Sequence, residues 1–130
     1  MAAGKHFLDY CATHPDAMIR YHASDMVLRI HSDATYISEP KVKSRVGGHH
    51  FLSNNSMYET PNNGAILTIA KLLKNFMASA TESEIAGIFH NAKEASVERI
   101  TLEEMRHKQP PTPIQTDSKT ADGILNETVK

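Results

Sequence analysis

"VLRIHSDATY", residues 27–36, is the stretch that decides the fold. Leu28 and Ile30 are typical of a strand built for a protein interior, and we predict a strand over 26–33. The run delivers a carboxylate, Asp33, at its far end, followed by small and polar residues. Composition alone leaves two interpretations of this acid: a turn residue that ends the strand, or a ligand in a functional site.

A second stretch, "TPIQTDS" at 112–118, has the same pattern, an apolar or alternating run that ends in an acid, Asp117. A strand that follows a helical crossover normally returns parallel to its neighbour, so we expect the two strands to lie side by side. Their acids would then emerge at one carboxyl edge, where open α/β sheets bind ligands. Asp117 also fits an N-cap for the helix expected to begin at Ser118 or Lys119.

Between them, "SATESEIAGIFHNAKEASVERITLEEM" at 79–105 is the clearest helix prediction. Ser79 with Glu82 matches the S/T-x-x-E capping box, and Thr81 with Glu84 matches it again. If the first pair makes the cap, Glu84 is free to join the two aspartates; otherwise it only closes the second box. The apolar positions follow helical spacing and are expected to face the core: Ile85, Ile88, Phe89, Ala92, Ala95 and Ser96.

The remaining segments complete an alternating order. We predict a short helix over 5–14 that ends at His14-Pro15, and a second strand around 48–54 that follows a basic loop. The run at 64–76 is ambiguous, because its periodicity favours a helix by a small margin while its β-branched residues suit a strand. The fold class indicated is α/β, a mixed sheet with helices packed on it.

Composition indicates one ordinary globular domain. The chain has 130 residues, is 40% hydrophobic, and carries 14 basic against 15 acidic side chains, so any charged partner must be held locally. Cys11 is the single cysteine, which excludes an intramolecular disulfide and favours a cytoplasmic or nuclear setting. No secretory signal and no run of about 18 apolar residues is visible, so we expect a soluble, intracellular protein without a membrane partner.

Three cations in five residues, Lys41, Lys43 and Arg45, are the best candidates for contacting a nucleic-acid backbone. At alternating positions of an extended segment they would share one side and meet phosphates; the alternative is a solvated loop. The neighbouring pair His49-His50 has no cysteine or histidine at zinc-finger spacing, and we interpret it as polar residues on a half-exposed strand.

Three carboxylates at one sheet edge would repel one another unless a divalent cation neutralised them. Hard oxygen ligands suit Mg²⁺ or Mn²⁺. Two such ions about 4 Å apart stabilise the attacking and leaving oxygens of phosphodiester cleavage. Asp33, Glu84 and Asp117 are therefore candidate metal ligands.

Three segments, in this order, carry a family resemblance: "LDYCATHPDAMIRYHASDMVLRIHSDATY", "SATESEIAGIF" and "PPTPIQTDSKTADGI". They resemble the ribonuclease H region at the carboxyl end of a copia-type LTR-retrotransposon polyprotein. The resemblance implies a ribonuclease H-like fold and two-metal hydrolysis of the RNA strand of RNA/DNA hybrids. It also implies that Asp33, Glu84 and Asp117 are the catalytic carboxylates and that 64–76 is a strand.

One feature of that family has no counterpart here, since a fourth acid on a later helix would lie beyond Lys130. The expectation is therefore a lead-in segment at 1–22 and a domain at 23–130 that is truncated at its C-terminus. Such a fragment is expected to have little or no ribonuclease activity, and to self-associate through uncovered sheet surface. The expected partners are an RNA/DNA hybrid and the rest of the polyprotein. A non-catalytic remnant acting as a structural or interaction module is the alternative.

Overall fold

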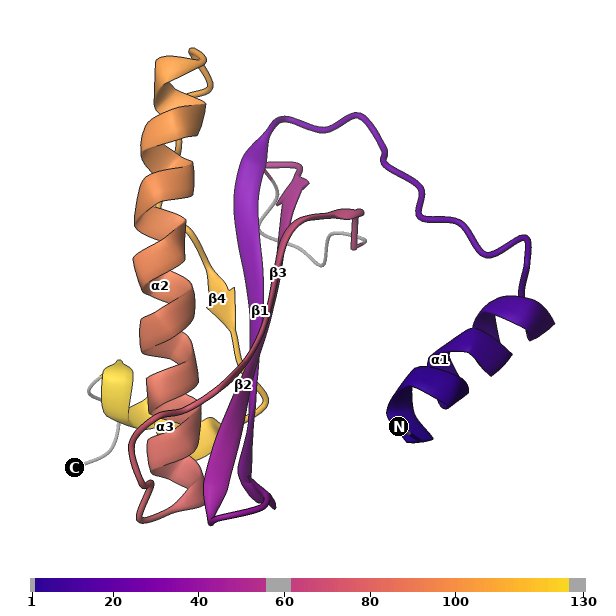
Figure 1. The fold of residues 1–130 in the computed structure, drawn as a ribbon. Helices are drawn as coiled ribbons and strands as arrows, with labels where there is room; N and C mark the ends of the chain where they lie inside the picture. Colours follow the sequence, from indigo (N-terminus) through magenta and orange to yellow (C-terminus); the bar gives the residue numbers. More distant parts are fainter. Residues whose placement is uncertain (1, 56–61, 127–130) are drawn as a thin grey trace.

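The computed structural model describes residues 2–55 and 62–126, which form an α/β fold (Figure 1). A mixed four-stranded sheet and three helices make up this part of the chain, consistent with a ribonuclease H-like architecture. The elements in chain order are α1 (Ala2–Thr13), β1 (Val27–Glu39), β2 (Lys43–Ser53), β3 (Ala65–Leu72), α2 (Ala80–Glu104), β4 (Ile114–Gln115) and α3 (Lys119–Leu125). None of these helices is long and apolar enough to cross a bilayer.

The strand order is β3-β2-β1-β4, with β1 in the interior of the sheet. β2 pairs antiparallel with both β1 and β3, whereas β4 pairs parallel with β1, Ile30 opposite Ile114. The predicted parallel pairing of the two acid-bearing strands is confirmed, and so is the strand interpretation of the ambiguous run. α2 lies along one face of the sheet (Figure 1).

Two predicted strand boundaries are wrong. β1 does not end at Asp33 but continues to Glu39, and β2 begins at Lys43 rather than near residue 48. The cause is the hairpin between these strands, whose pairing continues past Asp33 and Gly47 to Glu39 and Lys43, with a shift of register after Thr35. Its turn has positive φ at Lys41 (65°) and Val42 (59°), so the chain reverses there without the glycine that usually marks such a turn.

The face that α2 buries only partly matches the predicted one. Phe89 is 65% exposed, and the residues of the helix that lie against the sheet are mostly small or polar. They are Ser83, Gly87, Asn91, Ala95 and Leu102. The apolar core around them comes mainly from the strands, with Leu28 and Ile30 packed against Ala95 and Leu102. The helix was predicted correctly and Ala95 is buried as expected, but the buried face is turned away from Phe89 and Ser96, which are exposed.

Gly87 explains why small residues face the sheet. A Cβ atom there would lie 2.8 Å from Val46 Cγ1 and 3.5 Å from the backbone oxygen of Asp33. Contacts between carbon atoms are optimal at about 3.5–4.0 Å, so a side chain would push the helix away. The missing side chain therefore brings the first turns of α2 close to the middle of β1.

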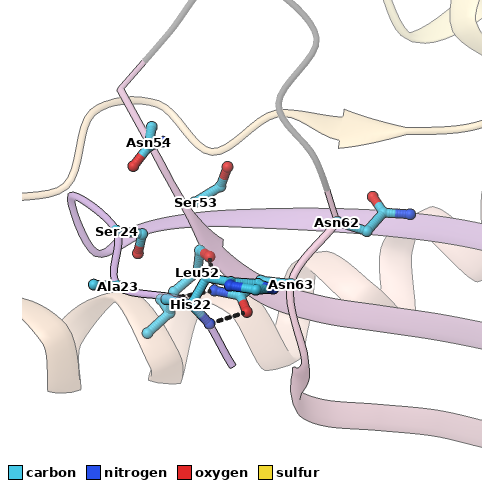
Figure 2. Close-up of a pocket in the computed structure, with 8 residues that line it drawn as sticks. All are labelled: His22, Ala23, Ser24, Leu52, Ser53, Asn54, Asn62 and Asn63. Carbon is cyan, nitrogen blue, oxygen red and sulfur yellow. Dashed lines mark hydrogen bonds between the residues drawn. The ribbon is translucent and has the colours of Figure 1, made fainter. Parts of the chain in front are cut away.

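α1 has no buried residues and stands apart from the sheet at the end of an extended segment (Figure 1). It confirms the predicted short helix but begins three residues earlier. The segment is attached through His22, whose amide donates to Asn63 Oδ1 (2.8 Å) and whose carbonyl accepts from Asn63 Nδ2 (2.9 Å). Figure 2 shows these bonds beside a hollow of only about 60 Å³ at the end of β1 distant from Asp33.

Candidate metal centre

Asp33, Glu84 and Asp117 lie together in the structure. Each offers one carboxylate oxygen, and these three atoms all lie within 4.8 Å of one another. The acids come from three parts of the chain: the middle of β1, the N-terminal part of α2 and the residues just after β4. The juxtaposition expected from the sequence is therefore found, and this cluster could hold a metal ion.

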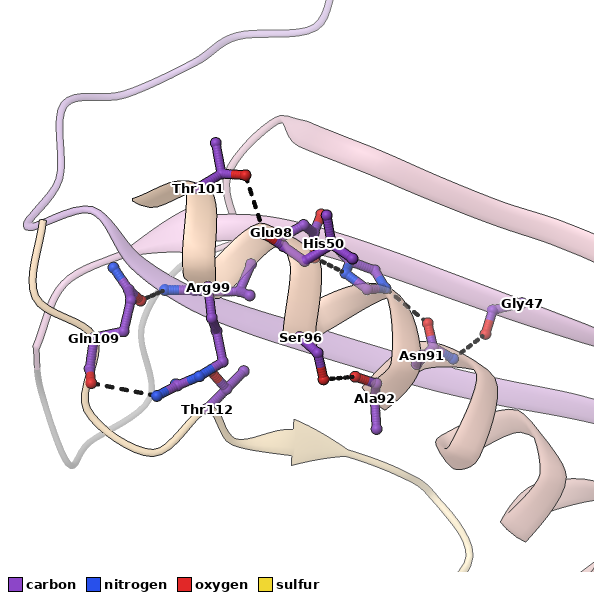
Figure 3. A network of polar contacts seen from close by, with 12 residues as sticks. Gly47, His50, Asn91, Ala92, Ser96, Glu98, Arg99, Thr101, Gln109 and Thr112 are labelled. Atoms are coloured by element: carbon purple, nitrogen blue, oxygen red, sulfur yellow. Dashed lines mark hydrogen bonds and ion pairs between the residues drawn. The ribbon is translucent and has the colours of Figure 1, made fainter. Parts of the chain in front are cut away.

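The segment that leads into β4 is fixed by two polar side chains. Gln109 is buried, accepts from the Leu28 amide (3.0 Å) and donates to the Met26 carbonyl (2.7 Å), so its side chain extends the edge of β1. Arg99 reaches from α2 to donate to Thr112 Oγ1 (2.7 Å) and to the Gln109 carbonyl, as Figure 3 shows. Through these bonds β1 and α2 together position the strand that carries Asp117.

Glu84 is not needed for the helix cap. Ser79 is the N-cap residue of α2, and its hydroxyl accepts from the Glu82 amide (3.1 Å). Glu82 in turn accepts from the Ala78 amide through Oε2. The first of the two possible capping pairs is therefore the one used, which leaves the Glu84 carboxylate for the acidic cluster.

Asp33 is not the strand-ending turn residue, and Asp117 is not the helix N-cap, that the sequence also allowed. The N-cap of α3 is Ser118, whose hydroxyl accepts from the Ala121 amide (3.2 Å), so Asp117 does not cap that helix. Asp33 lies within β1 and is not a turn residue, although its Oδ1 accepts from the next amide, that of Ala34 (2.9 Å). Both carboxylates are exposed.

Glu84 is the electrostatically unusual member of the cluster. Burial raises the pKa of its carboxyl, the negative charges of Asp117 and Asp33 raise it further, and a hydrogen bond from the Ala34 backbone opposes both effects. Its Oε2 atom is buried without a hydrogen-bond partner. A buried carboxylate oxygen that lacks a donor is costly, and either a proton or a cation removes that cost. The donor set of three carboxylates fits a hard divalent ion such as Mg²⁺ or Mn²⁺.

A buried polar network centred on His50 lies between β2 and α2 (Figure 3). His50 is fully buried; its Nδ1 lies 2.6 Å from Glu98 Oε2 and its Nε2 2.8 Å from Asn91 Oδ1. Burial by itself lowers the pKa of His50, but the hydrogen bonds to Glu98 and Asn91 and the charges of Glu98 and Glu94 outweigh it, so the pKa is raised. Both ring nitrogens face acceptors, an arrangement that the doubly protonated imidazolium satisfies.

The amide of Asn91 joins the strands to the helix. Its Nδ2 donates to Ser32 Oγ (3.0 Å), Gly47 O (3.1 Å) and Gly87 O (2.9 Å). Ser32 immediately precedes Asp33, and Gly87 lies one turn beyond Glu84. The network therefore fixes β1 against α2 next to the two positions from which these acids project.

No sequence pattern predicted this network. The half-exposed strand expected at His49-His50 is found, but only His49 is partly exposed, and His50 is fully buried. The physical reason is strand alternation: His50 faces α2, whereas its neighbour His49 faces the opposite side of the sheet. One signal was present, because Gly87, Asn91 and Ala95 are spaced four apart and lie on one helix face. Gly48 completes the fit, since a Cβ atom there would overlap the Asn91 side chain.

The three cations are not in one row. Lys41 is exposed in the turn, Lys43 is partly buried at the start of β2, and Arg45 is exposed on that strand. Lys43 and Arg45 share one face of β2, so two of the three keep the predicted arrangement. Arg45 pairs with Thr35, two residues beyond Asp33, which is about 7 Å along the strand.

Comparison with models of protein families, with curated proteins and with solved structures gives no match to this chain. The functional interpretation therefore depends on the sequence motifs and on the geometry described above.

Proposed function

We propose that the chain is a ribonuclease H-like domain of copia-type retrotransposon origin, whose ancestral chemistry is two-metal hydrolysis of the RNA strand of RNA/DNA hybrids. The observation that carries the proposal is the convergence of Asp33, Glu84 and Asp117 within 4.8 Å. These are the acids, in the chain order, that the family resemblance implies. The parallel pairing of β1 with β4 and the close approach of α2 at Gly87 support it.

The three carboxylates would hold Mg²⁺ or Mn²⁺, and these ions supply stabilisation of the attacking and leaving oxygens of a phosphodiester. The raised pKa of Glu84 favours the protonated form of its carboxyl while the cluster is free of metal. The Ala34 amide orients the Asp33 carboxylate by a 2.9 Å hydrogen bond. Lys43 and Arg45 follow along the neighbouring strand and are proposed to contact the phosphates of the hybrid.

Activity is proposed to be weak or absent. In the described part of the chain the cluster contains three carboxylates, and fewer ligands lower the affinity for a divalent ion. The second candidate function is a non-catalytic structural or interaction module. It is favoured by large exposed apolar side chains on α2, among them Phe89 (65%) and Val97 (63%).

Metal binding tests the site without requiring catalysis. Addition of Mn²⁺ is expected to raise the melting temperature of the wild-type chain, because a ligand that binds only the folded state stabilises it. The increase is expected to disappear in Asp33→Asn and Asp117→Asn and to persist in Asp9→Asn, a matched change on the exposed face of α1. A wild-type chain that Mn²⁺ does not stabilise would contradict an assembled site.

A cleavage assay then separates the two candidate functions. A labelled RNA/DNA hybrid is incubated with the purified chain and Mg²⁺ or Mn²⁺, and slow or undetectable cleavage is expected. Robust cleavage that Asp33→Asn abolishes would refute the proposed inactivity and establish the site. Metal-dependent stabilisation without hybrid binding would favour the non-catalytic module.

A further inference from the structure

A second hollow, of about 490 Å³, lies between α2 and the chain that connects it to β3. Leu73 and Met77, from the connecting chain, are buried and form its apolar floor. Phe89 projects from α2 at its side and is 65% exposed, and Leu72 at the end of β3 is 42% exposed. The volume lies within the range of about 300–1,000 Å³ typical of ligand sites.

The rim of this hollow carries two lysines, Lys71 and Lys74, which make it cationic. His90 also lines the hollow, and Lys93 follows one turn farther along α2. Burial lowers the pKa of His90, and the positive charges of Lys71 and Lys93 lower it further against the opposing charge of Glu94. Within residues 2–55 and 62–126, none of the three lysines forms an ion pair.

β3 adds a second feature, an open sheet edge that leads to the hollow. It pairs with β2 on one side and has no neighbour on the other within the described sheet. Tyr21 donates to the Ala65 carbonyl at the start of β3, and the strand then runs with partly buried and exposed residues in alternation to Lys71 and Leu72, which are both exposed. An open edge presents backbone donors and acceptors that an extended peptide can pair with.

We propose that the β3 edge and this hollow form a docking surface for an extended segment of a partner protein that carries one or two large apolar side chains flanked by carboxylates. The apolar side chains would enter the hollow beside Phe89, and the carboxylates would pair with Lys71 and Lys74. The strand edge decides the class of partner, because only another polypeptide backbone matches its alternating donors and acceptors. This surface is distinct from the acidic cluster and does not depend on nuclease function.

The test begins with random peptides displayed on phage and selected against the intact chain. Selected peptides are expected to combine aromatic or branched apolar residues with Asp and Glu, and to bind the wild type at least tenfold more tightly than Lys71→Glu/Lys74→Glu. The control is Lys5→Glu/Lys119→Glu, which makes the same charge change at exposed positions elsewhere and is expected to bind like the wild type. Thermal melts of all variants establish that they fold.

Pairing with the strand edge is tested separately with two methylated series of a selected peptide. In one series the odd backbone nitrogens are methylated, and in the other the even ones, so that each series blocks one edge of the extended peptide. One of the two methylated series is expected to lose binding, because it removes the donors that face β3. The proposal is overturned if no acidic, apolar peptide family is selected, if the double lysine variant binds such peptides unchanged, or if both methylated series bind unchanged. It is also overturned if the lysine changes leave peptide binding intact and instead abolish binding to phosphatidylserine vesicles or to an RNA/DNA hybrid. Sedimentation that shows a second copy of this chain on the surface would overturn it as well.

Discussion

His50 and Glu98 form a buried pair, with Nδ1 of the imidazole 2.6 Å from Oε2 of the carboxylate, between β2 and α2. The His50 side chain is fully buried and that of Glu98 is 16% exposed. A pair of this kind is costly to bury, but removal of one member is worse, because it leaves the other charge uncompensated. Its position next to Asn91 makes it part of the support for the acidic cluster.

Glu98→Gln is expected to destabilise the chain by about 3 kcal/mol, the lower end of the range for breaking a buried pair, because Glu98 keeps some contact with water. Urea unfolding at pH 6 measures the loss. Glu104→Gln, an exposed change at the last residue of α2, is the control and is expected to shift stability by less than about 0.5 kcal/mol. Equal effects of the two changes would contradict a structural ion pair.

The pH dependence of stability follows from the raised pKa of His50. The folded chain holds this proton more tightly than the unfolded chain, so the contribution is complete below about pH 6.5 and is lost as the pH rises through the folded-state pKa. We therefore expect the stability difference between the wild type and His50→Gln to shrink above pH 6.5. The difference curve isolates His50, since the other histidines are present in both proteins. A difference that grows with pH would show that His50 is buried as the neutral form.

Glu84, unlike His50, is expected to destabilise the folded chain when its side chain is charged and no metal is bound. Its carboxyl pKa is raised above the ordinary value of 4.5, so between that pH and the pKa of the folded state the folded chain binds more protons than the unfolded chain. The free energy of unfolding therefore falls as the pH rises through this window. In EDTA at pH 7, Glu84→Gln is expected to be more stable than the wild type by about 1 kcal/mol, because a buried, unpaired oxygen loses its charge. With Mn²⁺ the wild type is expected to gain more stability than the variant. Identical responses to Mn²⁺ would place the metal elsewhere.

Gly87→Ala tests the close contact between α2 and β1. Alanine favours a helix by about 1 kcal/mol over glycine, but here the added methyl group would meet Val46, and overpacking costs about 1–3 kcal/mol. We expect net destabilisation together with weaker Mn²⁺ binding, because the helix that carries Glu84 moves away from Asp33. Gly4→Ala is the control: nothing lies within 4 Å of a Cβ atom at that position.

Gln109→Leu tests whether the lead-in to β4 positions Asp117. The substitution is similar in size but leaves the Leu28 amide without its acceptor, at an expected cost of about 1–3 kcal/mol. Mn²⁺ affinity is expected to fall as well, because the strand that delivers Asp117 loses its attachment to β1. Gln115→Leu, an exposed change on β4, is expected to leave both quantities near the wild-type values. Unchanged metal affinity in Gln109→Leu would mean that Asp117 is placed by other contacts.

Local pattern was sufficient to predict the elements that carry the acids. The apolar alternation before Asp33, the capping signal before Glu84 and the strand before Asp117 are all short-range features, and each is found. Their convergence followed from one topological rule, the parallel return of a strand after a helical crossover. The end of β1 was not predictable in this way, because pairing with β2 decides how far the strand continues.

The supporting contacts needed tertiary information. Asn91 and His50 are 41 residues apart, and neither is apolar, so no periodicity connects them. The buried face of α2 was predicted only in part, because hydrophobicity identified Phe89 as a core residue, whereas close packing selected Gly87 and Ser83. The buried face of this helix is marked by small side chains and by the amide group of Asn91, and a search for apolar residues does not identify either feature.

Apolar residues of a helix are usually the ones that tolerate substitution least, and we expect the reverse along α2. Substituting charged residues for Phe89 or Val97 on the outer surface should leave the domain folded and more soluble, while a single added methyl group at Gly87 should damage it. Screens that seek higher stability through more hydrophobic side chains would change the exposed face of this helix and not its buried face. Redesign of the domain is better guided by side-chain volume on the inner face of α2 and by charge on its outer face.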